Sequence, residues 1–297
     1  MKVFTSLFLL FAVCSGFAQR VDSLYIAPYP QKMSISPFVA NNTLLVSNND
    51  VEYSPNNPIT VGVGFSIKNT VVNARLSYGA ADLQGKEYGK TKVVDFQLHN
   101  YGRKFIIDVF IQNYKGFYNE DKQNITLYPD MAVRQIGAEG TYLFNGGQFS
   151  AKAAFQHSEK QLQSAGSFAI GAGLYNYRMH LGDVLPDSGD EYIDNIQFGA
   201  NAGYAYSWVV NKYWLLSGMI TAGANVGNNP DNLKNIKLNV YPTAFARGAA
   251  AYRKNDWSVA FSMLIQNKLV YATKGNEFSV ASLGLQLMYV KRFDSFR

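Results

Sequence analysis

Few side chains in this sequence have the types and spacing that catalysis needs. The chain contains three histidines, His99, His157 and His180, and histidine is the usual general base at neutral pH. Ser158 follows His157 directly, but consecutive residues of a strand point to opposite faces, so these two do not form a Ser/His pair. We therefore predict no catalytic residues and a protein that is not an enzyme, with a hydrolase as the distant alternative.

One acidic segment has a spacing that could attract a cation. Asp183, Asp187 and Asp190 lie close to His180 in the sequence, and Gly189 precedes the last of these acids. Calcium loops place acidic ligands at alternate positions around a glycine turn, which this segment matches loosely. A solvated acidic loop is the simpler interpretation, and we expect no metal ion and no cofactor.

The N-terminal segment has the composition of a secretory signal peptide. Lys2 supplies a positive start, an apolar run extends from Val3 to Val13, and Gly16-Phe17-Ala18 offers small residues for cleavage near Ala18. The single cysteine, Cys14, makes a lipid-anchored N-terminus the alternative, but the residue before it is not small. Cleavage leaves a mature chain that begins at Gln19 without cysteine, which excludes disulfides and thiolate chemistry.

The composition differs from that of an average soluble enzyme. Hydrophobic residues make up 47% and aromatic residues 14% of the 297 residues, while charged residues make up 16%, against about a quarter in typical domains. After the N-terminal segment no run of about 18 apolar residues occurs, which excludes a transmembrane helix. The net charge is +6, but no Lys/Arg run interleaved with aromatics indicates nucleic-acid binding. A soluble all-β domain and a membrane barrel remain.

From Pro58 onward the sequence alternates between apolar and small polar residues. In Ile59 to Ile67, Ile, Val and Phe lie on one face and Thr, Gly and Ser on the other, which is the period-two pattern of a strand. The same pattern predicts strands at Val72–Tyr78, Val94–His99, Phe105–Gln112, Gln148–Gln156, Ile196–Trp208, Trp257–Gln266 and Ser282–Tyr289.

The content of the two faces favours the barrel. A soluble sandwich has a charged, solvated polar face, whereas here that face is mainly Gly, Ser, Ala, Asn and Gln. Small polar residues suit a barrel interior, large apolar residues suit lipid, and the runs reach the roughly 9–11 residues of a membrane-spanning strand. We predict an all-β fold, a single closed antiparallel transmembrane β-barrel with a range of about 10–14 strands and about 12 as the best estimate.

The positions of the connections leave two points of the topology open. Short and long connections alternate up to Phe155 and again after Ile193, but the two halves are out of phase. Either a strand lies between Ser164 and Leu181, with a turn at Gly171-Ala172-Gly173, or the connection from Arg178 to Tyr192 is a long periplasmic one. We divide the chain into a signal peptide (1–18), an N-terminal segment that caps or plugs the barrel or adds a strand at 33–47 (19–57), and the barrel (58–297).

Aromatic residues gather beside the predicted short turns, such as Asn211-Lys212 and Arg253–Asp256. Rings that carry a polar atom collect at membrane interfaces, so we predict an interfacial band, with ordinary strand-end aromatics as the alternative. The predicted band consists of Trp208, Tyr213, Trp214, Tyr252, Trp257 and Tyr289.

The last predicted strand resembles the final strands of outer-membrane proteins. These strands carry a polar residue, a glycine two positions later and two spaced hydrophobic residues, which here correspond to Ser282, Gly284, Leu287 and Tyr289. The resemblance implies recognition by the outer-membrane barrel assembly machinery, through pairing with an open strand edge. Together with the signal peptide, it predicts export through the inner membrane and insertion into outer-membrane lipid.

Several short motifs resemble an uncharacterised family of Bacteroidota outer-membrane barrels, the domain of unknown function DUF4421. They are Tyr25-Ile26-Ala27-Pro28-Tyr29-Pro30, Glu52–Pro58 leading into Val61-Gly62-Val63-Gly64, and Ser164-Ala165-Gly166-Ser167-Phe168. The resemblance extends from about Tyr25 to the end of the chain. It implies a barrel of unknown biochemical role and supplies no catalytic residues.

Polar residues on the inward face of the predicted barrel are the candidates for function. Charges inside a barrel either pair to rigidify a closed lumen or set the selectivity of an open one. The predicted lumen-facing residues are Arg75, Asp95, Gln97, Asp108, Lys152 and Asn201. We expect a narrow, porin-like channel or a transport barrel that binds a small solute or a hydrophobic ligand; the alternatives are a structural or adhesive surface protein acting through its extracellular loops, and an outer-membrane hydrolase.

Overall fold

The computed structural model describes residues 21–48, 51–67, 73–122, 124–184, 192–228, 238–273 and 276–294. The predicted signal peptide, the turn at Asn69 and the acidic residues Asp187 and Asp190 lie outside these ranges. The main sheet consists of β2 (Met33–Asn48), β3 (Val51–Tyr53), β4 (Pro58–Ile67), β5 (Asn73–Asp82), β6 (Lys92–Tyr101), β7 (Phe105–Asp121), β8 (Asn124–Leu143), β10 (Ala165–His180), β11 (Ile193–Val209), β12 (Trp214–Asn228), β13 (Leu238–Lys254), β14 (Trp257–Thr273) and β15 (Asn276–Phe293).

A second, two-stranded sheet and three short helices complete the described structure. The small sheet pairs β1 (Ile26–Pro28) with β9 (Glu159–Gln161). The helices are η2 (Lys86–Tyr88), η3 (Lys152–Gln156) and η4 (Gly182–Val184). None of the helices among the described residues has the length and apolarity needed to cross a membrane.

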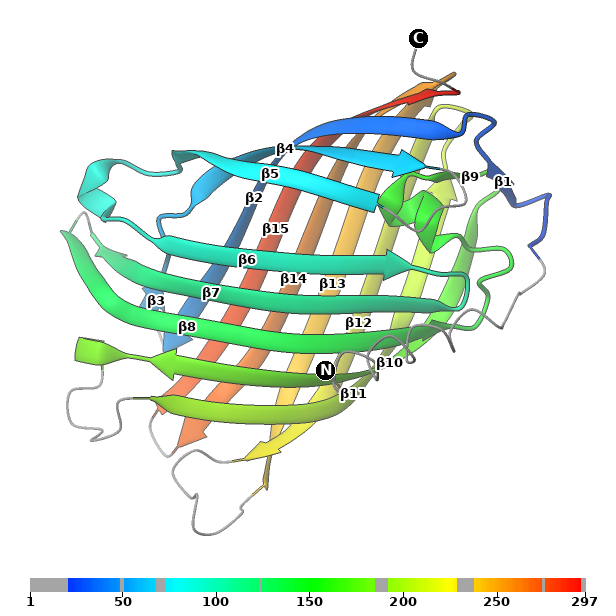
Figure 1. Ribbon diagram of the computed structural model, residues 1–297. Helices are drawn as coiled ribbons and strands as arrows, with labels where there is room; N and C mark the ends of the chain where they lie inside the picture. Colours follow the sequence, from blue (N-terminus) through cyan, green and yellow to red (C-terminus); the bar gives the residue numbers. More distant parts are fainter. Residues whose placement is uncertain are drawn as a thin grey trace, which may run out of the picture.

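The strands of the main sheet follow one another in the order β5-β4-β2-β15-β14-β13-β12-β11-β10-β8-β7-β6, and β3 pairs with β2 beside this path. Every pair is antiparallel. The sheet curls back on itself, so that β6, β7, β8, β10 and β11 lie opposite β2, β15, β14, β13 and β12 (Figure 1). The predicted all-β antiparallel fold and the range of strand numbers are confirmed.

The strand predicted at Gln148–Gln156 is wrong. Residues 145–163, which we call the plug, instead form turns, the π-helix η3 and the short strand β9. Phe149, Ala151, Ala153 and Ala154 are buried there. The prediction failed because apolar residues at these spacings fit a buried helical turn as well as they fit an alternating strand. The plug begins with the turn residues Asn145-Gly146-Gly147.

The phase problem in the sequence disappears with this correction. The segment from Ala165 to His180 is the continuous strand β10, paired with β8 and β11, and no turn interrupts it at Gly171-Ala172-Gly173. Of the two alternatives, a strand between Ser164 and Leu181 is therefore the correct one. The N-terminal segment contributes in two ways, because β2 joins the main sheet between β15 and β4 while β1 pairs with the plug.

The two ends of the sheet differ in their connections. At one end lie the turns 102–104, 210–213 and 255–256, together with β1, the plug and the end of β15; we call this the short-turn end. At the other end, the connection from β5 to β6 is held by the side chain of Asn56. Its Nδ2 donates to the carbonyl oxygens of Gly85 (3.3 Å) and Gly89 (2.9 Å), while its Oδ1 accepts from the Gln84 N–H (3.0 Å).

The β11–β12 pair is bent sharply, and glycines on its inner face allow this bend. A Cβ atom at Gly203 would overlap the carbonyl oxygen of Ile220 on the neighbouring strand, and one at Gly223 would overlap that of Ala200. Each of these glycines stands opposite a polar residue, since Gly203 pairs with Thr221 and Gly223 with Asn201. Glycine is thus required at these positions by the close approach of backbone, not by its own backbone angles.

We expect Gly203→Ala to lower the free energy of unfolding by about 1–3 kcal/mol, because the new methyl group must push β12 away. The matched control is Ala202→Val, at the residue that precedes Gly203 on β11. The side chain of Ala202 is exposed on the opposite face of the sheet. The control should change stability by less than about 0.5 kcal/mol. Urea unfolding in lipid vesicles, followed by tryptophan fluorescence, measures both; equal effects would contradict the bend.

Candidate functional site

The outer face of the sheet is apolar across several strands. Ile220 is 68% exposed, Phe168 69%, Phe198 63% and Val240 68%, although soluble proteins rarely expose large contiguous apolar patches. Between these residues along each strand lie buried ones, so the two faces of the sheet differ strictly. The large apolar residues therefore point away from the enclosed side.

The predicted aromatic residues lie together at the short-turn end. Tyr252 is the centre of the group, with ring centroids 5.8 Å from Tyr213, 5.2 Å from Trp214 and 5.6 Å from Trp257. Trp257 continues the row to Tyr289 at 6.1 Å. The rings thus form a continuous band across β12, β13, β14 and β15. Trp208 lies at the corresponding end of β11 and is 53% exposed.

The opposite edge of the apolar face is a row of polar residues. Asn113, Arg134, Arg178 and Asp194 are neighbours on β7, β8, β10 and β11, and Arg178 donates two hydrogen bonds to Asp194 (2.7 and 2.9 Å). From Ile196, just inside this row, to Trp208, β11 covers roughly 40 Å at about 3.3 Å per residue. A strand tilt of about 40° reduces this to about 30 Å. That height equals the hydrocarbon core of a bilayer.

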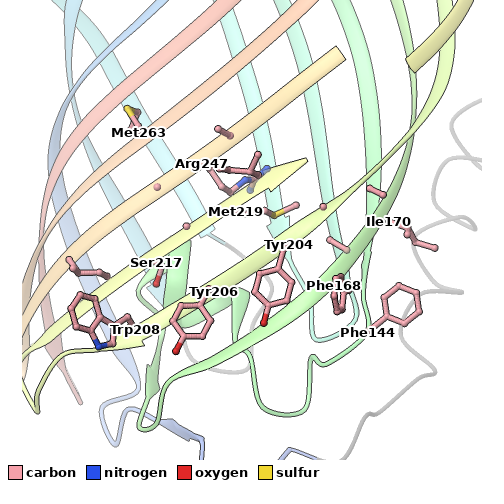
Figure 2. A pocket seen from close by; sticks show the side chains of 18 residues that line it. Phe144, Phe168, Ile170, Tyr204, Tyr206, Trp208, Ser217, Met219, Arg247 and Met263 are labelled. Atoms are coloured by element: carbon pink, nitrogen blue, oxygen red, sulfur yellow. The ribbon is translucent and has the colours of Figure 1, made fainter. Parts of the chain in front are cut away.

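A shallow depression of about 1350 Å³ lies in the outer face, over β10 to β14. Its lining includes the small residues Ala202, Gly218, Ala246 and Gly248. Tyr204, Tyr206 and Trp208 project from β11 along one side of it, with Phe168 and Phe144 beside them (Figure 2). The depression is apolar and continues toward the aromatic band, so it suits contact with hydrocarbon.

The inner face carries most of the predicted lumen-facing residues. Asp95 and Gln97 on β6, Asp108 on β7 and Asn201 on β11 all lie on the more buried side of their strands. Lys152 lies in η3 within the plug, not on a strand of the wall, because the strand predicted around it is absent. Arg75 lies on β5, where side chains are outside the described part of the structure.

An ion pair joins opposite walls of the sheet. Arg247 on β13 donates from Nη2 to Oδ2 of Asp108 on β7 (2.7 Å), and both side chains are 3% exposed. His99 on β6 lies 2.6 Å from the other carboxylate oxygen, measured from its Nδ1. Arg247 also donates from Nη1 to the Tyr101 hydroxyl (2.9 Å) and stacks over Phe245 at 4.6 Å.

Two further polar clusters lie on the enclosed side. Asp95 accepts hydrogen bonds from Gln97 (3.0 Å), Gln112 (3.1 Å) and the Tyr114 hydroxyl (2.6 Å). Glu139 on β8 accepts from the hydroxyl of Tyr175 and from Nδ2 of Asn201 (2.9 Å). Lys268 on β14 reaches across from the opposite wall and lies over the ring of Tyr175. A polar layer therefore crosses the middle of the sheet.

The polar layer lies between two apolar clusters. At the short-turn end, Phe149 and Ala154 of the plug pack with Ile106, Leu143 and Met219 of the walls. At the other end, large buried side chains from opposite walls meet. They include Leu44, Tyr53, Phe110, Phe117, Met131, Tyr177, Met179 and Phe278. Side chains thus fill the enclosed space at both ends.

Three arginines of the wall hold the plug. Arg103 donates to the Glu159 carboxylate (2.5 Å), Arg253 to the carbonyl oxygen of Gln161 (3.3 Å) and Arg292 to the carbonyl oxygen of His157 (2.6 Å). Hydrogen bonds from a charged donor contribute about 1.5–3 kcal/mol each when they are protected from water. The plug is therefore held by polar contacts as well as by its apolar residues.

At the far end, a tyrosine pair supports the Asn56 contacts. The rings of Tyr88 and Tyr118 meet edge to face at 4.8 Å, and the Tyr88 hydroxyl lies 3.5 Å from the Glu120 carboxylate. Partial desolvation and the negative charge of Glu120 raise the pKa of Tyr88, so this hydroxyl stays protonated and donates. Ser54 forms an isolated bridge with Tyr118, with both N–H···O distances 2.8 Å.

The four residues of the predicted assembly signal lie on β15. Ser282 and Gly284 occupy inner positions, and Leu287 and Tyr289 are exposed on the outer face at 54% and 40%. β15 pairs with β14 on one side and with β2 on the other along most of its length. In the folded protein this strand is therefore not an edge of the sheet.

Sequence reasoning missed three of the central residues, Glu139, Arg247 and Lys268. Arg247 stands in the run Ala244-Phe245-Ala246-Arg247-Gly248, where a lone charge among small residues on a strand was the available signal. Around Glu139 the alternation is blurred, because the outer face of β8 also carries Arg134.

Among the described residues, His99 and Asp108 form an Asp/His pair of the kind that a hydrolase would need. It lies inside the sheet near the short-turn end, and the second carboxylate oxygen is occupied by Arg247. Within the described ranges, no group of three or more His, Cys, Asp or Glu residues could hold a metal ion. Asp187 and Asp190 of the predicted acidic loop lie outside those ranges, and only the backbone of Asp183, in η4, is described.

The sequence matches the family model described as Domain of unknown function (DUF4421) over residues 20–293, and the chain belongs to this family. A comparison with curated proteins gave no match.

Similar solved structures include two outer-membrane proteins and a transporter by their titles. The outer membrane protease OmpT of Escherichia coli is 7% identical, with 90% of this chain and 98% of that chain covered and a TM-score of 0.35. The outer-membrane expressed OmpT of Vibrio cholerae is 10% identical, with 92% and 100% covered and a TM-score of 0.31. The toluene transporter TodX of P. putida is 10% identical, with 91% and 92% covered and a TM-score of 0.26. Such low similarity transfers no activity to this chain.

We expect Asp108→Asn to lower the free energy of unfolding by about 3–5 kcal/mol, because it leaves the Arg247 charge buried without its partner. The double variant Asp108→Asn with Arg247→Met should recover a large part of this loss, since no buried charge then remains unpaired. Urea unfolding of both single variants and the double variant gives the coupling between them. Additive losses would show that the pair does not join the walls.

Proposed function

We propose that this protein is an outer-membrane β-barrel that conducts small polar solutes, and that the plug closes it in the state described here. The observation that carries the proposal is the contrast between the two faces of the sheet. An apolar outer face with an aromatic band at one edge and a charged row at the other surrounds an enclosed layer of buried charge. This arrangement suits a wall between lipid and a polar interior.

A soluble β-sandwich, the alternative to a membrane barrel, does not explain the composition of the two faces of the sheet. In water the outer face would expose Ile220, Phe198 and Val240 while the inner face buried Asp108 and Glu139, which is the reverse of the usual partition. In hydrocarbon, the N–H and C=O groups of every strand must be paired. We therefore infer that β5 and β6, the two ends of the strand order, pair with each other and close the barrel in the membrane.

The connections at the two ends of the sheet suggest how the barrel is oriented in the outer membrane. The short turns, β1 and the end of β15 lie at one end, and in outer-membrane barrels the short turns face the periplasm. We propose export with cleavage near Ala18, recognition of β15 by the barrel assembly machinery, and lipid contact through the outer face. The other end of the sheet, with η2 and η4, then faces outward.

Conduction is favoured over a purely structural role by the content of the interior. A barrel that only anchors surface loops could fill its lumen with apolar side chains, which costs less than burying charges. Here the middle layer is charged and the periplasmic plug is held by three arginine contacts. The structural or adhesive role stands as the second candidate, because apolar clusters fill the barrel at both ends of the polar layer.

We propose that the chain is not an enzyme. Asp108 binds Arg247 and His99 at once, so this carboxylate is committed to holding the walls together. A hydrolase would instead need its base free to approach a substrate.

The membrane assignment predicts a depth-dependent cost for a charge on the outer face. Ile220→Arg should destabilise the barrel in lipid vesicles by about 2–4 kcal/mol, because Ile220 lies near the middle of the apolar face. Trp214→Arg, on the same strand and the same face but within the aromatic band, should cost about 0–1 kcal/mol from the charge itself. Equal small losses at both positions would indicate a protein that does not span a bilayer.

The conduction proposal predicts that the plug limits current through a planar bilayer. The intact chain should be silent or open rarely, and replacing Arg103, Arg253 and Arg292 together with glutamine should give frequent openings, because these contacts release the plug. Replacing residues 148–161 by a short Gly/Ser linker should give longer openings than the triple variant, because only the apolar cluster at the other end of the polar layer then still narrows the lumen. A folded barrel of this kind, verified by the change in its gel migration on heating, that carries no current would favour the structural or adhesive role.

A further inference from the structure

Lys268 is a buried lysine of the polar layer. The residue is 2% exposed, on the inner face of β14, and its ammonium group lies over the ring of Tyr175 from the opposite wall. Among the described residues it forms no ion pair and donates no hydrogen bond to a protein oxygen. A buried cation in this situation costs several kcal/mol unless a partner neutralises it.

The other buried cations of the enclosed side each donate to at least one protein oxygen, although Nε of Arg247 and Nη1 of Arg292 have no partner. Arg247 binds the Asp108 carboxylate and the Tyr101 hydroxyl. Arg292 donates to the carbonyl oxygen of His157 and to the Ser258 hydroxyl (3.1 Å). Lys268 differs from both, so its lack of a partner is particular to its position and not a property of this interior.

The nearest carboxylate does not serve Lys268 directly. Glu139 already accepts a hydrogen bond at each oxygen, from Tyr175 at Oε2 and from Asn201 at Oε1. Its charge acts on Lys268 through space, across the ring of Tyr175. The ammonium group of Lys268, which carries three N–H donors, therefore contacts the ring of Tyr175 and has no oxygen acceptor among the described residues.

Further polar atoms without hydrogen-bond partners lie on the inner face of β14 and of the strands beside it. Gln266, two residues before Lys268 on the same face of β14, is 2% exposed and its Nε2 has no hydrogen-bond partner, while its Oε1 accepts from Gln135 (3.5 Å). Oδ1 of Asn201 and Oγ1 of the buried Thr221 are also without partners. Thr221 stands in register with Phe245, which in turn pairs with Gln266, so these atoms belong to one part of the layer.

The geometry points to a binding site in the middle of the barrel for a small carboxylate anion, held by Lys268 and Gln266. The carboxylate oxygens would accept from the lysine ammonium and the glutamine amide, and a hydroxyl or amine of the same molecule would meet Asn201 and Thr221. The inference deepens the proposed function, since it names the class of solute, and it rests on the enclosed face being a lumen. A carboxylate is favoured over a neutral solute because only an anion compensates Lys268.

The test uses acetate and acetamide, which have the same shape and differ in charge. The full chain is refolded from urea into zwitterionic detergent with either compound present, so that entry past the plug is not required. A ligand that binds the folded state alone stabilises it by RT ln(1 + [L]/Kd), which keeps growing as the ligand is titrated. We expect acetate to raise the urea midpoint more than acetamide does at equal concentration, with the difference growing as acetate is titrated.

Three variants locate the effect. Lys268→Gln should abolish the difference between acetate and acetamide, while Lys212→Gln, which removes a surface charge in the turn 210–213, should leave it unchanged. Glu139→Gln should strengthen acetate binding several-fold, because it removes the negative charge near the site; a merely structural role of Lys268 predicts no such gain.

Equal effects of the two compounds, or a difference that survives in Lys268→Gln, would overturn the site and leave the unpartnered atoms to water alone. This outcome is separate from the bilayer current, because a barrel that conducts without binding acetate sinks the site alone. A barrel that binds acetate but never conducts sinks the proposed channel and keeps the site.

Discussion

Arg247 and Asp108 meet across the enclosed space, and the arrangement of the two walls depends on this contact. A buried ion pair contributes little net stability when both charges could be replaced by apolar groups, but either charge alone is very costly. The pair therefore acts as a constraint on geometry: β13 must lie opposite β7 at the height where the guanidinium reaches the carboxylate. Tyr101 and Phe245 contact the guanidinium and fix its direction, while His99 holds the other oxygen of Asp108.

The plug and the polar layer have different physical characters, and this separates their roles. Phe149 and Ala154 of the plug pack against apolar wall residues, which stabilises the plug in place without specifying a solute. Arg253 and Arg292 donate to backbone carbonyl groups of the plug, and those oxygens can exchange the arginine for water when the plug moves. The charged groups of the middle layer are instead buried between the walls. In the channel proposed above, the plug would act as the gate and the charged layer as the selectivity region.

The sequence predicted the wall far better than the interior, and the reason is physical. Alternation reports which face a residue occupies, because it depends on the strand alone, so Ile59–Ile67 and Ile196–Trp208 were assigned correctly as strands. It does not report which residue lies opposite across the barrel, since that depends on the curl of the whole sheet. Lys268 and Glu139 were missed for this reason. The strand predicted at 148–156 was wrong for a different reason. Phe and Ala at alternate positions fit both a strand and the buried helical turn that the structure contains.

The motif Glu52–Pro58 shows how a local feature acquires a role through topology. From the sequence, Pro55 and Pro58 with Asn56-Asn57 indicate a stiff turn before β4. In the structure the Asn56 side chain binds both glycine carbonyls and the Gln84 N–H of the β5–β6 connection, and its backbone N–H donates to Thr91 Oγ1 (2.8 Å). Thr91 in turn donates to the carbonyl oxygen of Gly116 on β7 (2.7 Å). The chain between β3 and β4 thus fixes the two ends of the strand order relative to each other at the end of the sheet away from the short turns. In the closed barrel proposed above, pairing of β5 with β6 would extend from this fixed point toward the short-turn end. The backbone groups most costly to leave unpaired in hydrocarbon would then be brought together by residues that lie outside it.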